Sequence, residues 1–134
     1  MELILVRHGE PRWVVEGRNR NDPELTERGH AQAARAAARL ADPHAEPGDG
    51  PVDRLWVSPA RRARETCAPI AAALGLAPVT HDWLTEMKMP PDWDDRPIEV
   101  VEAAFAERHH KPRSEWWDAM PGAEPMGAFH DRVA

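Results

Sequence analysis

The chain has 134 residues, enough for one domain with its own core and too few for two domains of common size. Its net charge of −6 argues against a general nucleic-acid or anionic-membrane binder. A single cysteine, Cys67, excludes a disulfide within these residues, and no stretch is apolar for long enough to predict a membrane span. The N-terminus also lacks a signal-peptide pattern, so we expect one cytoplasmic domain over residues 1–134.

Strands and helices are predicted to alternate along the chain. Three strands are expected, over residues 2–7, 52–57 and 77–84. Four helices are expected, over residues 28–41, 58–74 and 98–109 and from about residue 126. Loops are expected over residues 10–25, 42–51 and 88–97.

Individual residues mark where these elements begin and end. Residues 3–6 are all apolar, which predicts a first strand covered on both faces. Thr26 can cap the first helix, and Ser58 followed by Pro59 is a typical start of the second helix. Gly75 is expected to end that second helix.

The alternation of strands and helices predicts an α/β domain with parallel strands. Ligands bind such sheets beyond the carboxyl ends of the strands. Arg7, His8 and Gly9 follow the first predicted strand and Ser58 follows the second, so we expect these segments to meet at that edge.

The residue types at these two strand ends suit a phosphate. A helix N-terminus is a ready anion site, and Arg7 with Arg61 or Arg62 could add guanidinium groups to it. His8 would then lie beside the phosphorus, where a neutral imidazole can act as a nucleophile. Gly9 would let the backbone pass close to the bound group.

Four segments in this order, "LVRHGE", "DPELTERGHAQA", "VSPARRARETC" and "LTE", resemble the histidine phosphatase superfamily, also called the phosphoglycerate-mutase-like family. The resemblance implies a three-layer α/β/α fold with a mostly parallel sheet. It also implies phosphomonoester hydrolysis through a phosphohistidine on His8, without a metal or other cofactor. Arg7, Arg62 and Gly9 would bind the phosphoryl group, and Glu86 would be the acid and base.

The sequence departs from the family at one position of the site. Family members carry a second histidine after a late strand, and residues 122–134 resemble the helix before that strand. We therefore expect a chain truncated before the second histidine, without the C-terminal strand and helix. This leaves a catalytically impaired phosphate-binding remnant as an alternative to an active phosphatase.

A phosphoglycerate-type mutase is the other alternative. Pro11 replaces the serine or threonine of mutases, and Val14 rather than asparagine follows Trp13. Glu86 is also followed by Met and Pro residues instead of the basic and aromatic cluster of mutases. These differences favour a phosphatase that acts on a small phosphorylated metabolite.

Other polar and aromatic residues have simpler interpretations. Arg61 and Arg64 are expected to be solvated helix charges, and Cys67 a small helix residue rather than a nucleophile. Histidines 109, 110 and 130 do not have the spacing of metal ligands, so we expect no metal site. Trp13 and Arg12 are candidate substrate contacts. The oligomeric state is open, with a dimer as one option.

Overall fold

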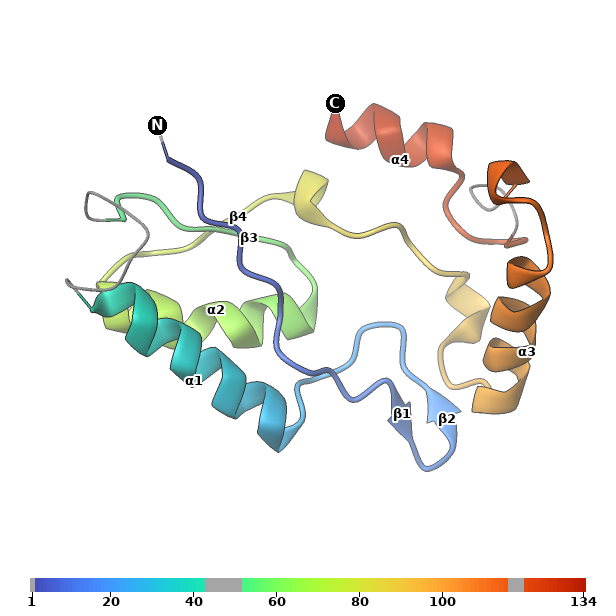
Figure 1. The fold of residues 1–134 in the computed structure, drawn as a ribbon, viewed down its shortest axis with the longest axis horizontal. Coiled ribbons are helices and arrows are strands. Elements are labelled where there is room, and N and C mark those ends of the chain that lie inside the picture. Colours follow the sequence, from blue (N-terminus) through green and yellow to red (C-terminus); the bar gives the residue numbers. More distant parts are fainter. Residues whose placement is uncertain (1, 43–51, 116–119) are drawn as a thin grey trace. The chain divides into compact units, whose positions relative to one another are not determined.

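The computed structural model describes residues 2–42, 52–115 and 120–134 (Figure 1). These residues form two compact units. The first unit contains the residues up to Arg12 together with Asp22–Leu84, and the second contains Trp13–Asn21 and the residues from Thr85 onward. That both units belong to one domain stays a prediction.

Two helices, α1 (Glu27–Ala41) and α2 (Arg61–Leu74), pack against each other in the first unit (Figure 1). The prediction for α1 is confirmed, because the Thr26 side chain caps this helix and accepts a hydrogen bond from the Gly29 amide. The buried residues Ala33 and Ala37 are small, which lets the two helices approach closely. The predicted end of α2 is also confirmed, since Gly75 adopts a left-handed conformation with φ of 66°.

Two short parallel strands, β3 (Trp56–Val57) and β4 (Val79–Thr80), flank α2 in the chain. Trp56 pairs with Val79 and Val57 with Thr80. A strand, a helix and a second parallel strand form the βαβ unit that the sequence predicted. Both strands are shorter than predicted.

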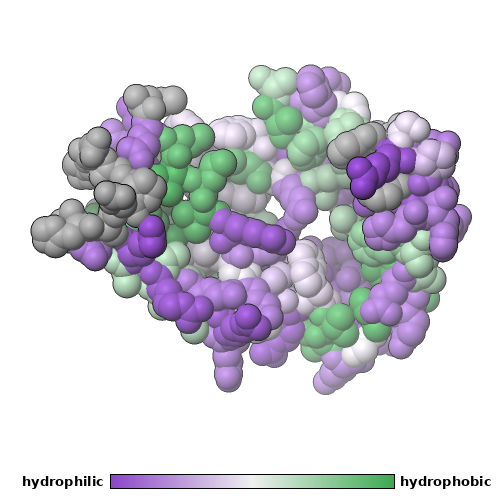
Figure 2. Space-filling model, in the orientation of Figure 1, coloured by the Kyte–Doolittle hydropathy of each residue, from purple (hydrophilic) through white to green (hydrophobic). Residues whose placement is uncertain are grey.

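The strand predicted for residues 2–7 is wrong for the described residues. Residues 2–10 contain no strand, and their apolar side chains are not covered: Leu3 is 69% and Leu5 84% exposed. Figure 2 shows apolar side chains gathered on the face where the N-terminal segment of Figure 1 runs. A strand requires a hydrogen-bonding partner along its edge, and no described segment pairs with residues 3–6.

The second unit contains a β-hairpin where a loop was predicted. Strand β1 (Val14–Val15) pairs antiparallel with β2 (Arg18–Asn19) across a two-residue turn. Both turn residues have positive φ, 52° for Glu16 and 73° for Gly17, as tight hairpin turns require. The backbone amide of Asn19 donates to Arg96 O at 2.8 Å and that of Ile98 donates to Gly17 O at 2.8 Å, which joins the hairpin to the start of the next helix.

Helices α3 (Ile98–His109) and α4 (Met126–Val133) confirm the two predicted C-terminal helices. Short 3-10 turns lie outside them, at Asp82–Leu84 in the first unit and at Pro91–Trp93 and Arg113–Glu115 in the second. The core of the second unit contains Val101 and Met120, and the rings of Trp93 and Phe105 pack edge to face with centroids 5.6 Å apart. Most of the predicted 42–51 loop lies outside the described residues.

Candidate functional site

The Arg7-His8-Gly9 segment lies against helix α2. Gly9 is buried, His8 is half-buried and Arg7 is exposed. The Gly9 amide donates a 3.0 Å hydrogen bond to Thr66 Oγ1, and the same hydroxyl donates to Arg62 O at 2.7 Å. One buried side chain thus joins the histidine segment to the first turn of α2, which carries Arg62.

The ring of His8 has a defined orientation. Its Nδ1 lies 2.8 Å from Gly9 O. Because a carbonyl oxygen only accepts, this contact places the proton on Nδ1. In the neutral ring, Nε2 then carries the lone pair.

Gly9 and Gly29 come into close backbone contact. A β-carbon on Gly9 would lie 2.9 Å from Gly29 C and 3.0 Å from Gly29 Cα, and one on Gly29 would lie 3.0 Å from Glu10 N. These distances are too short for non-bonded carbon and nitrogen atoms, and backbone atoms cannot move away cheaply. Both positions therefore require glycine to pack the histidine segment onto α1.

The segment after Gly9 is also attached to the start of α1. Thr26 N donates to Glu10 O at 2.9 Å, and Thr26 Oγ1 donates to Glu10 Oε2 at 2.7 Å. The Glu10 amide donates to Gln32 Oε1 at 2.7 Å. The motif residues Thr26, Gly29 and Gln32 therefore all hold the backbone of residues 9–10.

The N-terminus of α2 differs from the prediction. The helix begins at Arg61 with Ala60 as its N-cap, so the assignment of Ser58 as the cap is wrong; Ser58 Oγ accepts a 3.3 Å hydrogen bond from the Ala60 amide. The Arg61 amide instead donates to Asp22 Oδ1 at 2.7 Å. The Asp22 carboxylate therefore binds one amide at the helix end where the sequence suggested a phosphate.

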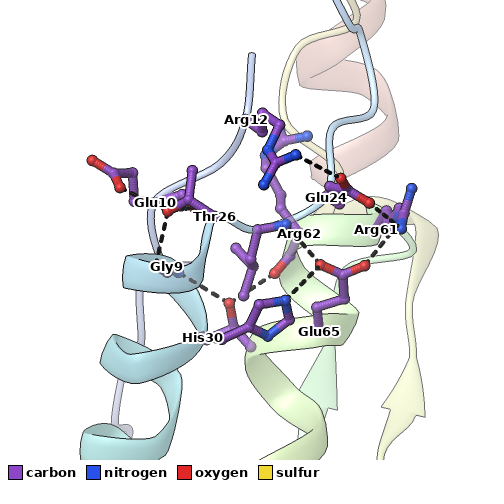
Figure 3. A network of polar contacts seen from close by, with 12 residues as sticks. Gly9, Glu10, Arg12, Glu24, Thr26, His30, Arg61, Arg62 and Glu65 are labelled. Atoms are coloured by element: carbon purple, nitrogen blue, oxygen red, sulfur yellow. Dashed lines mark hydrogen bonds and ion pairs between the residues drawn. The ribbon is translucent and has the colours of Figure 1, made fainter. Parts of the chain in front are cut away.

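Arg61 and Arg62 have different surroundings. Arg62 is buried, with Nη1 3.8 Å from Asp22 Oδ1. Arg61 is exposed and pairs with two carboxylates, Glu65 Oε1 at 2.7 Å and Glu24 Oε2 at 2.6 Å (Figure 3). Arg61 thus belongs to a surface ion-pair network, which leaves Arg62 as the better candidate for a ligand.

Glu65 connects this ion-pair network to the loop before α1. Its Oε2 accepts a 2.7 Å hydrogen bond from the Leu25 amide. Burial acts to raise the pKa of Glu65, but the hydrogen bonds from Leu25 and Arg61 outweigh it, and the pKa lies below its ordinary value. Arg12 joins the same network, with Nη1 3.6 Å from Glu24 Oε1.

Glu86 lies in the second unit, in a segment without a helix or strand. Its side chain is exposed, and its backbone carbonyl accepts a 3.1 Å hydrogen bond from Arg132 Nη2. Trp13 belongs to the same unit and is 40% exposed at the start of the hairpin. The structure thus brings Arg7, His8, Gly9, Arg12 and Arg62 into one unit, and it places Trp13 and Glu86 in the other.

The sequence interpretation missed Thr66, Glu65 and Asp22. Each acts through one hydrogen bond to a distant backbone amide, and no local pattern reveals such a partner. Thr66 did have a signal: it lies four residues after Arg62 and is therefore on the same face of α2.

Three further observations concern the cysteine thiol, metal ions and membranes. Burial raises the pKa of the Cys67 thiol, which does not favour a nucleophilic thiolate. Within the described ranges, no three His, Cys, Asp or Glu side chains lie close enough to hold a metal ion. No described helix is both long and apolar enough to cross a membrane.

Comparison with known proteins identifies the family. The model of the histidine phosphatase superfamily, branch 1, matches residues 3–134. The chain belongs to this family. The resemblance seen in the four sequence segments is therefore confirmed.

Curated relatives of this histidine phosphatase chain include phosphatases and mutases. Phosphoserine phosphatase 1 of Hydrogenobacter thermophilus is 30% identical over 99% of the chain and 61% of its own length. A 2,3-bisphosphoglycerate-dependent phosphoglycerate mutase of Caulobacter vibrioides is 38% identical over 60% of the chain and 34% of its own length. The chain thus spans about three fifths of the phosphatase relative and a third of the mutase.

Solved structures support the phosphoglycerate-mutase-like α/β fold. The alpha-ribazole phosphatase of Shigella flexneri superimposes with a TM-score of 0.68 at 27% identity, over 96% of this chain and 61% of that protein. The parallel β3–α2–β4 unit agrees with such a fold. The three-layer arrangement stays a prediction.

Proposed function

We propose that this histidine phosphatase chain hydrolyses phosphate monoesters of small metabolites through a phosphohistidine on His8. Arg7 and Arg62 bind the phosphoryl oxygens in this proposal, and Gly9 contributes backbone at the site. The reaction uses no metal ion or other cofactor, so a chelator leaves the rate unchanged.

The hydrogen bond between the Gly9 amide and Thr66 Oγ1 is the observation that most supports the proposal. It ties the nucleophile's segment to the helix turn of Arg62, although the two are more than fifty residues apart. A histidine, a buried guanidinium and a fixed backbone then belong to one unit. A phosphoryl group needs this combination of nucleophile and positive charge.

In the proposed first step, His8 Nε2 attacks phosphorus and the bond from phosphorus to the ester oxygen breaks. Nδ1 keeps its proton and continues to donate a hydrogen bond to Gly9 O, 2.8 Å away. Glu86, as a carboxylic acid, gives its proton to the leaving oxygen. In the second step water attacks the phosphohistidine, Glu86 takes a proton from that water, and phosphate and free His8 are released.

The proposed substrate class follows from the family, and two side chains that follow the histidine segment in the sequence are candidates to contact the substrate. Relatives bear names of enzymes for phosphoserine and phosphoglycerate, which are small polar phosphate compounds. Arg12 and Trp13 are proposed as substrate contacts because they lie within five residues of His8 in the sequence and are partly exposed.

Hydrolysis of p-nitrophenyl phosphate by wild type, His8→Ala and His110→Ala tests the proposal. His110 is exposed at the end of α3 and serves as the matched control. We expect His8→Ala to lose activity at least about a thousandfold and His110→Ala to keep it. Undiminished turnover by His8→Ala would overturn the proposal.

Two other outcomes would indicate the alternative functions. A wild-type chain that binds vanadate or phosphate but turns over no ester would be a catalytically impaired phosphate-binding protein. Transfer of phosphate between the carbons of a phosphoglycerate, without net release, would indicate a mutase.

A further inference from the structure

We propose that Glu124 and Arg132 are positioning residues that hold the backbone of the proposed acid Glu86. This inference rests on the proposed function, because it concerns how Glu86 is presented to the reaction. It assigns a role to a part-buried ion pair in the second unit that the proposed chemistry does not use directly.

The ion pair between Arg132 and Glu124 has a fixed geometry. Arg132 Nε donates to Glu124 Oε1 at 2.7 Å, and Nη2 donates to Oε2 at 2.9 Å. Such a bidentate pair fixes orientation as well as distance. The two side chains are only 21% and 11% exposed, so water competes little for these hydrogen bonds.

Both members of the pair also bind the backbone around Glu86. Arg132 Nη2 donates to Glu86 O at 3.1 Å. The Lys88 amide donates to Glu124 Oε2 at 3.1 Å, and the Glu124 amide donates to Lys88 O at 2.9 Å. Three hydrogen bonds therefore hold the chain at residues 86 and 88.

These contacts matter because Glu86 has no regular structure to hold it. Residues 85–90 form neither helix nor strand. A general acid must be placed within hydrogen-bond reach of the leaving oxygen, so a loosely held backbone lowers its efficiency. Arg132 itself is anchored on α4, where its guanidinium lies 4.9 Å from the centre of the Phe129 ring.

The leaving group distinguishes a positioning role from a general structural one. An alkyl phosphate needs a proton on its leaving oxygen, whereas p-nitrophenyl phosphate scarcely does. Loss of acid catalysis therefore slows phosphorylation by the alkyl substrate selectively, by about a hundredfold or more. Loss of folded protein slows both substrates equally.

Single-turnover phosphorylation of wild type, Glu86→Gln, Arg132→Lys and the double variant by both substrates tests the inference. Arg132→Lys keeps the charge but loses the bidentate contact. Arg96→Lys is the matched control, because Arg96 pairs with Asp92 at 2.8 Å on an exposed surface of the same unit. Thermal unfolding of each variant measures its folded fraction.

We expect Arg132→Lys to slow the alkyl phosphate at least about tenfold more than p-nitrophenyl phosphate. It should have no further effect on that ratio in the Glu86→Gln background, and Arg96→Lys should not change the ratio. Equal slowing of both substrates by Arg132→Lys, while Glu86→Gln is selective, would overturn the inference and leave the proposed function intact. A wild type that becomes phosphorylated by neither substrate would overturn the proposed function and this inference together.

Discussion

The backbone of Gly9 lies so close to the backbone of Gly29 that Gly9 has no room for a β-carbon, and Gly29 has none because of the backbone of Glu10. The sequence suggested that Gly9 lets the chain approach a bound phosphate. The structure gives a different reason for this glycine, because its neighbour is the first turn of α1. Whether Gly9 also contacts a phosphoryl group stays a proposal.

Replacing either glycine by alanine should destabilise the protein by about 1–3 kcal/mol, the usual cost of overpacking. Gly29→Ala is informative because alanine in a helix is otherwise favoured over glycine by about 1 kcal/mol. Gly127→Ala in α4 is the matched control, since a β-carbon there would meet no described atom within 4 Å apart from its chain neighbours and the backbone of its own helix. Urea unfolding should show that Gly29→Ala lowers the free energy of unfolding and that Gly127→Ala raises it. A stabilising Gly29→Ala would contradict the close contact.

Thr66→Val should weaken the attachment of the histidine segment to α2. Valine keeps the shape but removes the hydroxyl, so the buried Gly9 amide loses its acceptor at a cost of about 1–3 kcal/mol. Thr66→Ser keeps the hydroxyl and serves as the control. We expect Val, but not Ser, to reduce kcat for p-nitrophenyl phosphate. A loss in Ser as large as that in Val would show that the hydroxyl alone does not account for the effect.

Arg62 and Arg61 should contribute unequally to phosphate affinity. Arg62 is buried, and its backbone is joined to the histidine segment through the Thr66 hydroxyl. Arg61 is engaged by Glu24 and Glu65. Arg62→Lys should lower the affinity for inorganic phosphate or vanadate about tenfold or more, because charge-assisted hydrogen bonds are lost. Arg61→Lys should have little effect on this affinity. Titration calorimetry measures both constants, and a larger effect at Arg61 would reverse the assignment.

Several elements could be predicted from the sequence because their signals are local. The cap at Thr26, the left-handed end at Gly75 and the bounds of Ile98–His109 all depend on neighbouring residues. The strand predicted at residues 2–7 is wrong, because a strand depends on partners elsewhere in the chain that the local pattern does not reveal. The hairpin was missed because a Glu-Gly turn between two-residue strands is a weak signal.

The candidate site shows the same division. The sequence identified His8 and Arg62 from motifs, and the structure places both in one unit. The sequence did not identify Asp22, which accepts the hydrogen bond from the first amide of α2. Ser58 or a phosphate was expected at this end of the helix. Hydrogen bonds between residues far apart in the chain decide such details, and periodicity does not record them.

Stability should fall in acid as Glu65 is protonated. Its pKa is lowered in the folded state: burial acts to raise it, but the hydrogen bonds from Leu25 and Arg61 prevail. A lowered folded pKa stabilises the fold above the ordinary carboxyl value, about 4.3, and this contribution is lost as pH falls through the folded pKa. Glu65→Gln should therefore destabilise the protein more at pH 7 than at pH 3.

Urea unfolding at both pH values checks this prediction for Glu65. Glu102→Gln, an exposed change on α3, controls for the loss of one negative charge. A loss of stability that is the same at pH 7 and pH 3 would show that the ionised carboxylate is not what stabilises this site.

Trapping the phosphorylated protein tests the central claim, phosphoryl transfer to His8, most directly. The protein is mixed with a radiolabelled phosphate ester, quenched, and analysed for label that survives base and is lost in acid, as expected of phosphohistidine. The account predicts such label in wild type and in His110→Ala, located by mass spectrometry on the peptide that contains His8, and none in His8→Ala. Label of the same amount and acid lability in His8→Ala would contradict it.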